Sequence, residues 1–203
     1  PRMAPLPPAL LDCVVPDLPT PSDIAHWLDL DITELEWLTG PLQRPLREGM
    51  HATHYHYRWL PKRSGGLRLL EIPKARLRTI QHRILRGILE YVPPHEAAHG
   101  FRERHSCVTN ARPHVAQAVV MRMDLEDFFG SIGGGKVYEF FAALGYPAAA
   151  ARALTRLTTC ATPRDVWTAE RLPSADGGTR DIAWRTRKRL ASAHLPQGAP
   201  TSP

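Results

Sequence analysis

The sequence has few cysteines, few lysines and no long apolar run. Its three cysteines, Cys13, Cys107 and Cys160, form no C-x-x-C pair, which argues against a disulfide framework and against a zinc knuckle. The start, PRMAPLPPALLDCVV, is interrupted by Pro and by Asp12 and makes a poor signal sequence, and no later segment approaches the length of a membrane span. We therefore expect a soluble, cytoplasmic protein with reduced thiols and no membrane partner.

Lysine supplies only 4 of the 26 basic side chains, and with 20 acidic residues the formal net charge is +6. The other basic residues are arginines, whose planar guanidinium group can bind a phosphate through two hydrogen bonds. This favours a nucleic acid or a nucleotide as partner. An arginine-rich proteome encoded by GC-rich DNA would give the same composition, so the charge permits such a partner without requiring it. The 43% apolar content is typical of a globular chain.

Hydrophobic spacing predicts a mixture of helices and a hairpin in the first half of the chain. After a Pro-rich start, PSDIAHWLDLDITELEWLTG predicts two short helices, the first capped by Ser22 and the second by Asp31, with Glu34 completing a capping-box pattern. HYHYRWLPKRSGGLRLLEIP predicts an antiparallel hairpin around its SGG turn. KARLRTIQHRILRGILEYV then predicts a basic amphipathic helix, a face that could follow a phosphate backbone or simply be solvated.

The second half alternates loops, one strand and helices. A loop leads into a short helical stretch through Asn110, and AVVMRMD predicts a buried strand that ends at Asp124. KVYEFFAALGY and PAAAARALTRLTT predict two further helices. Residues 163 to 194 lose the apolar rhythm and carry DGG, which predicts an irregular segment or a long hairpin.

The stretch MRMDLEDFFGSIGGGKV contains two overlapping patterns. GSIGGGK matches the G-x-x-x-x-G-K spacing of a phosphate-binding loop, but Val137 follows Lys136 where a Ser or Thr is needed to hold magnesium. A phosphate-binding loop also needs a strand that runs directly into the glycines, whereas the predicted strand here ends earlier, at Asp124. We therefore expect residues 133–135 to start the next helix, and a phosphate-loop hydrolase is the least favoured hypothesis.

The acidic residues of this stretch suit a divalent cation better. At the end of an apolar strand, Asp124 would present a carboxylate that can hold a hard cation together with substrate phosphates. Glu126 and Asp127 are more typical of solvated or capping acids, although Asp127 could lie near a triphosphate. His51, His54 and His56 have a spacing that could bind zinc, but no further ligand pair accompanies them, so an exposed strand face is the favoured interpretation.

Four ordered blocks resemble prokaryotic reverse transcriptases of the retron type and their group II intron-like relatives. The blocks are RWLPKRSGGLRLLEIPKARLRTIQHRIL, HGFRERHSCVTNARPH, VVMRMDLEDFFGSI and LPQGAPTSP. The resemblance covers roughly residues 22 to 203 and implies an α+β right-hand polymerase fold, with fingers and the first part of the palm behind an N-terminal helical extension. The implied divisions are residues 1–50, a Pro-rich start and helical extension, residues 51–115, fingers, and residues 116–203, partial palm.

The resemblance also assigns roles to individual residues. It makes Asp124 the first palm carboxylate, which holds magnesium together with the backbone carbonyl of Leu125, and Phe129 the aromatic gate against a ribose 2′-hydroxyl. It places the remaining matched residues near the nucleotide or the template and primer: Lys62, Arg63, Arg68, Asp127 and Gln197 for the nucleotide, and Gly198 and Asn110 for the template and primer. Phe129 as a core residue, and Asn110 as a brace for its loop, are the structural alternatives.

The implied activity is RNA-directed DNA synthesis with Mg²⁺. Its implied partners are an RNA template, a DNA or RNA primer and deoxynucleoside triphosphates, and a structured non-coding RNA is compatible with the resemblance. Retron DNA synthesis, intron mobility and phage defence are equally open as biological roles. The Tyr-x-Asp-Asp block that carries the other palm carboxylates is absent from these residues, as is a thumb, so we expect this chain alone not to polymerise. The alternative is a non-catalytic nucleic-acid-binding module on a shortened polymerase fold.

Overall fold

The computed structural model describes residues 1–7, 10, 13–40, 45–47, 50–51, 54–62, 67–168, 171–172 and 177–203, with the backbone alone for 45–47, 50–51 and 177–183. The α-helices are α1 (Pro21–Leu28), α2 (Ile32–Thr39), α3 (Ala75–Gly87), α4 (Cys107–Ala111), α5 (Phe128–Ser131), α6 (Gly134–Ala143), α7 (Ala148–Thr158) and α8 (Gly177–Leu190). The strands are β1 (Pro45–Arg47), β2 (Met50–His51), β3 (Tyr55–Pro61) and β4 (Leu67–Pro73), and 3-10 turns lie at Leu89–Tyr91, Arg112–His114 and Arg164–Trp167. The predicted α+β content is confirmed.

The two N-terminal helices form as predicted, with one different cap. The first begins after Thr20, whose hydroxyl accepts a hydrogen bond from the Asp23 backbone at 3.2 Å while the Asp23 carboxylate accepts from the Thr20 backbone at 2.9 Å. Thr20, and not Ser22, is therefore the cap. Asp31 caps α2 through the Glu34 backbone at 2.7 Å. Glu34 does not close the capping box, because its carboxylate binds both Nε and Nη2 of Arg76.

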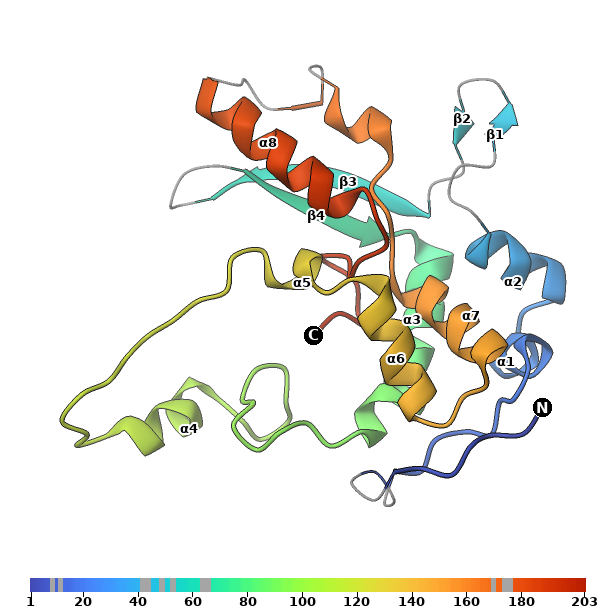
Figure 1. Cartoon of the computed structure of the whole chain (residues 1–203), viewed down its shortest axis with the longest axis horizontal. Coiled ribbons are helices and arrows are strands. Elements are labelled where there is room, and N and C mark those ends of the chain that lie inside the picture. Colours follow the sequence, from blue (N-terminus) through green and yellow to red (C-terminus); the bar gives the residue numbers. More distant parts are fainter. Residues whose placement is uncertain are drawn as a thin grey trace.

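The main core lies between α1, α2, α3, α6 and α7 (Figure 1). Apolar side chains at helical spacing meet there and are removed from water, which is the main source of stability for a chain of this size. The largest fully buried side chains of this core are Ile24, Leu35, Ile80, Ile84, Ile88, Phe141, Leu144, Leu154 and Leu157.

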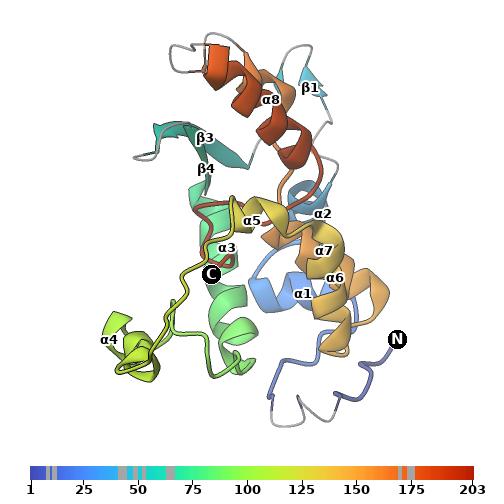
Figure 2. The same ribbon diagram turned by 60° about the vertical axis from the view of Figure 1, so that its left-hand side comes forward.

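The predicted hairpin is confirmed, and β3 pairs with β4 in an unbroken antiparallel register from Tyr55↔Pro73 to Pro61↔Leu67. The turn that contains Arg63 lies outside the described residues. Alternate residues of β4 point inward, so Glu71 occupies a buried position of the strand. Helix α8 and the Arg164–Trp167 turn pack on this hairpin (Figure 2), where Leu69, Val166 and Leu190 form a second, smaller core.

The predicted buried strand that ends at Asp124 is wrong. Residues 115–126 are all exposed and form no strand, and Val119, Met121 and Met123 are 77–83% exposed. This segment belongs to an excursion, residues 93–127, that runs through α4 and away from the main core (Figure 1). A strand needs a neighbour to receive its backbone hydrogen bonds, and none of the described strands pairs with this segment.

The prediction of an irregular segment over residues 163–194 is also wrong, because α8 occupies its second half. Gly177 and Gly178 start this helix instead of forming a turn. Its described side chains, from Trp184 on, are mostly exposed, and Leu190 alone among them is buried. Over these described side chains the contact face is narrow and shows no clear apolar period, and this is why the sequence pattern did not reveal the helix.

The histidine cluster does not form the exposed strand face that was predicted. His54 is buried and its Nε2 lies 3.2 Å from the Trp37 carbonyl, whereas His56 is exposed. Burial lowers the pKa of His54, and the side chain of His51 lies outside the described residues. Across the ranges given above, no helix combines the length and hydropathy that a membrane span requires.

Candidate functional site

A pocket opens between β4, the start of α5, the end of α8 and the turn that follows α8. It is a small hollow with a cavity volume of about 30 Å³. Its polar lining comes from four separate segments and consists of Arg68, Glu71, Asp127, Thr186, Arg189 and Gln197. Its apolar lining consists of Leu67, Leu69, Leu190 and Leu195. The hollow is much smaller than the roughly 300–1,000 Å³ of a usual ligand pocket, but a few polar groups converge on it.

Two cations meet at Asp127 on the rim of this pocket. Lys62 Nζ lies 2.9 Å from Asp127 Oδ1, and Arg189 Nη1 lies 3.5 Å from Oδ2. These side chains are 21–33% exposed, so water screens the pairs, and each stabilises the fold by at most about 1 kcal/mol. Their effect is geometric, because they bring the hairpin, α5 and α8 together and place positive charge beside the pocket.

The turn after α8 is attached to β4 through its backbone. The Glu71 N–H donates to the Gln197 carbonyl at 2.9 Å. Gly198 has a φ of +121°, and a Cβ there would lie 3.4 Å from the Glu71 carbonyl oxygen. Only glycine adopts this backbone conformation readily, so Gly198 allows the turn to approach the strand closely. The sequence resemblance assigned Gly198 to close approach of template and primer, and the contact in this structure is with β4.

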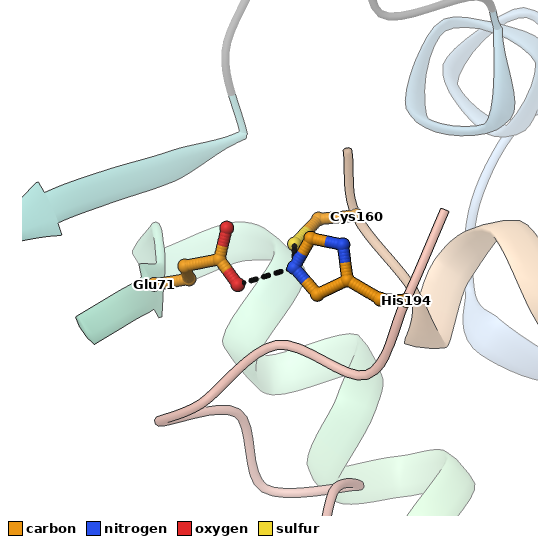
Figure 3. A group of neighbouring side chains, drawn as sticks. All are labelled: Glu71, Cys160 and His194. Atoms are coloured by element: carbon orange, nitrogen blue, oxygen red, sulfur yellow. Dashed lines mark hydrogen bonds and ion pairs between the residues drawn. The ribbon is translucent and has the colours of Figure 1, made fainter. Parts of the chain in front are cut away.

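Below the pocket, Glu71 belongs to a buried polar cluster with Cys160 and His194 (Figure 3). Glu71 Oε2 lies 2.7 Å from His194 Nε2, and Cys160 Sγ lies 3.6 Å from the same nitrogen. The Thr162 hydroxyl donates to Glu71 Oε1 at 2.6 Å, and His194 Nδ1 donates to the Ser192 carbonyl at 2.8 Å. Burial, and then the charge of Glu71, raise the pKa of the Cys160 thiol well above its usual value, so the thiol stays protonated.

Glu71, Cys160 and His194 are the only three side chains of metal-ligand type that come together in the described part of the chain, with ligand atoms within 4.8 Å of one another. Two ligand atoms on a tetrahedral zinc lie about 3.3 Å apart, given metal bonds of about 2.0–2.2 Å. The 2.7 Å separation of Glu71 Oε2 and His194 Nε2 is shorter and matches a hydrogen bond. The cluster therefore has the geometry of a hydrogen-bonded pair rather than of a metal centre.

The structure brings together part of the set of residues that the sequence predicted. Arg68, Asp127 and Gln197 line the pocket, and Lys62 joins them through Asp127. Phe129 lies on α5, half-buried, with its ring edge-to-face against Phe128 at a centroid distance of 5.6 Å. Arg68, Asp127, Gln197 and Lys62 therefore lie close together, whereas Phe129 is not among the pocket-lining residues and Arg63 lies outside the described residues.

The predicted metal ligands and template contact lie elsewhere. Asp124 and Leu125 belong to the exposed segment, where Leu125 is 69% exposed, and Asp124 is not part of the metal-type group described above. Asn110 lies on α4 in the same excursion (Figure 1). Among the residues that the structure describes, a two-metal site around Asp124 is therefore not assembled.

Sequence reasoning missed Arg189, Glu71 and His194. Arg189 lay in a stretch predicted to be irregular, so nothing indicated that it would face the hairpin. Glu71 did carry a signal, because it stands at an inward position of β4 between Leu69 and Pro73, where an unpaired acid would be costly. His194 had no comparable signal, since its partner is 123 residues away in the chain.

The glycine run starts α6, as predicted. Gly133 is the residue before the helix, and the segment that precedes it is α5 and not a strand. Lys136 is exposed on the first turn of α6. The strand-to-glycine geometry of a phosphate-binding loop is thus not formed here.

Comparison with known proteins identifies several similar curated sequences, among them the following three. The chain is 39% identical over 140 residues to the retron Mx65 reverse transcriptase of Myxococcus xanthus, a match that covers 69% of this chain and 32% of that protein. It is 33% identical over 187 residues to the retron Mx162 reverse transcriptase of the same organism, covering 92% of this chain and 35% of that protein. It is 33% identical over 91 residues to the retron Ec86 reverse transcriptase of Escherichia coli, covering 45% of this chain and 28% of that protein. No protein-family model matches the chain.

Proposed function

Because the chain belongs to the retron-type reverse transcriptases and spans about a third of the length of the relatives it matches, we propose that it forms the fingers and first part of the palm of an RNA-directed DNA polymerase. In this proposal, residues 1–50 are the helical extension, residues 51–115 the fingers and residues 116–203 the partial palm. The pocket beside Asp127 receives the incoming deoxynucleoside triphosphate.

The observation that carries the proposal is the convergence of Arg68, Asp127 and Gln197 on one pocket. The three residues lie far apart in the chain, and each was expected at the nucleotide from the sequence alone. Lys62 and Arg189 add two further cations at the rim. A triphosphate carries several negative charges, and converging guanidinium and ammonium groups can neutralise them through charge-assisted hydrogen bonds.

Within this pocket each side chain has a distinct role. Arg68, Lys62 and Arg189 bind phosphate oxygens, and Gln197, held against β4, contacts the nucleotide. Phe129 lies next to the sugar, where its ring excludes a ribose 2′-hydroxyl. Arg63, which lies outside the described residues, is a further phosphate ligand in this proposal.

Reverse transcriptases use divalent cations, and we assign Mg²⁺ to Asp124 and the Leu125 carbonyl in the complete protein. The described residues do not bring a second carboxylate group together with Asp124 as a metal site. These residues therefore do not fit a two-metal centre as they stand, and the chain on its own is expected not to extend a primer.

The partners in this proposal are an RNA template, a DNA or RNA primer and a structured non-coding RNA, in the cytoplasm. The exposed basic face of α3, with Arg78, Arg83 and Arg86, suits a phosphate backbone. Asn110 and Gly198 remain proposed template or primer contacts. The exposed position of Asp124 favours one second candidate, a nucleic-acid-binding module without catalysis.

The test is calorimetric titration of this chain with dATP and Mg²⁺. Arg68→Ala and Arg189→Ala are each expected to weaken binding about tenfold, because one charge-assisted hydrogen bond contributes about 1.5 kcal/mol or more. Arg152→Ala, which removes an exposed arginine of α7, is the charge-matched control and should bind like the wild type. Equal affinities in all four proteins would refute the pocket assignment. RNA binding without any nucleotide binding would favour the non-catalytic module.

A further inference from the structure

The buried Glu71–His194 pair joins segments that are distant in the sequence. Glu71 comes from β4 and His194 from the turn after α8 (Figure 3). Thr162, which donates to Glu71, comes from the segment after α7. Both acidic and imidazole side chains are at most 2% exposed. Since His194 Nδ1 donates to the Ser192 carbonyl, a proton must also lie between His194 Nε2 and Glu71 Oε2, because two acceptors would repel each other at 2.7 Å.

Backbone hydrogen bonds join the segment around His194 to three other parts of the chain. His194 and Cys160 exchange two backbone hydrogen bonds of 2.9 and 3.0 Å, and the Leu195 N–H donates to the Ile132 carbonyl at 3.0 Å. Three residues after His194, the Gln197 carbonyl accepts the Glu71 N–H. Glu71 thus contacts this turn twice, by its carboxylate at His194 and by its backbone at Gln197.

A buried ionisable pair rarely adds net stability over well-packed apolar residues, because desolvation offsets the attraction. Its hydrogen bonds are directional, however, and they define one relative position of the groups they join. The position defined here is that of the turn carrying Gln197, and Gln197 lines the pocket together with Glu71 itself.

We propose that Glu71 and His194 are positioning residues, which hold the turn of residues 194–198 against β4 and so place Gln197 at the nucleotide pocket. The role at the nucleotide rests on the proposed function, whereas the attachment of the turn to β4 does not. Thr162 and Ser192 complete the arrangement by orienting the carboxylate and the imidazole.

Hydrogen exchange of the Glu71 amide, followed by NMR, reports this attachment directly, because its acceptor is the Gln197 carbonyl. In Glu71→Met/His194→Leu, which keeps the volume but removes the hydrogen bonds, the protection factor of this amide should fall about tenfold or more, the factor that corresponds to 1.4 kcal/mol of local stability. Amides of α6 and α7 should keep their protection. Glu71→Gln should stay close to the wild type, because its amide can accept from Thr162 and donate to His194 Nε2.

Leu28→Ala in α1 is the control for general destabilisation. Leu28 is a buried residue of the main core and is distant in the sequence from Glu71 and His194. Unchanged protection of the Glu71 amide in the double variant would overturn the proposal, and so would a loss spread over the whole chain as in Leu28→Ala. If the double variant does not fold, Thr162→Val provides a milder one. The protection factor of the Glu71 amide should then fall by a smaller amount. Unchanged protection in Thr162→Val would again overturn the proposal.

The exchange measurement uses no nucleotide, so its result is independent of the proposed function. Titration with dATP and Mg²⁺ then adds the second readout. The double variant should bind more weakly than Glu71→Gln, although both retain Arg68 and Arg189. If the wild-type chain binds no dATP, the proposed function fails while the exchange data still decide whether the pair holds the turn.

Discussion

The Asp127 carboxylate is the negative charge that pairs with two cations at the rim of the pocket. The Asp127 backbone is left-handed, with φ 48° and ψ 46°, and its carboxylate takes both Lys62 and Arg189. Asp and Asn tolerate this conformation better than other residues with side chains. The carboxylate forms ion pairs with Lys62 and Arg189, the two cations that the proposed function assigns to phosphate. An incoming triphosphate must therefore compete with Asp127 for them.

Asp127→Asn should therefore strengthen the binding of inorganic tripolyphosphate to this chain. The variant keeps the left-handed backbone but removes one negative charge beside the phosphate site. We expect affinity to rise roughly threefold or more at low salt and the gain to shrink as salt is added, because exposed charges are screened. Isothermal titration at two salt concentrations measures this. Glu139→Gln, which removes an exposed charge from α6, is the control and should leave affinity unchanged. A weaker or unchanged affinity of Asp127→Asn would show that Lys62 and Arg189 do not face the phosphates.

At the scale of elements, α3 approaches α1 closely at Gly87. A Cβ on Gly87 would lie 2.5 Å from the Trp27 ring, over which the Arg83 guanidinium also lies at 5.6 Å from the ring centroid. Gly135, by contrast, has no neighbouring atom within 4 Å of its Cβ position, and it also lies in a helix. The two glycines thus form a matched pair for the same substitution.

Gly87→Ala should destabilise the chain by about 1–2 kcal/mol, since forcing a methyl group against packed atoms costs about 1–3 kcal/mol and outweighs a gain of up to about 1 kcal/mol in helix propensity. Gly135→Ala should be neutral or stabilising, because that gain meets no clash. Urea unfolding of the two variants and the wild type measures the difference. If Gly87→Ala proved as stable as Gly135→Ala, α1 and α3 would not be in contact at Trp27.

The elements that sequence reasoning predicted correctly are those whose signals are local. The Asp31 cap, the SGG pattern and wide apolar faces predicted α1, α2, the hairpin, α3, α6 and α7, although the cap expected for α1 was wrong. Among the described side chains of α8, from Trp184 on, only Leu190 is buried, which is too little to show a period. The strand predicted before Asp124 failed for the opposite reason, because its pattern is clear but the described residues supply no strand to pair with it. Likewise, the nucleotide-site residues assigned by resemblance did not include Arg189, whose position depends on α8.

For the whole molecule, the structure predicts that the apolar segment 115–126 contributes nothing to the core. Val119→Lys should change the free energy of unfolding by no more than about 0.5 kcal/mol, as is usual for an exposed site. Val137→Lys makes the same change at a buried position of α6, where a charge without a partner should cost several kcal/mol, a large part of a total stability of about 5–15 kcal/mol. Thermal unfolding of both variants, at two protein concentrations, measures the contrast. Strong destabilisation by Val119→Lys would mean that the segment is buried in solution, and dependence on concentration would identify a second copy of the chain as the cover.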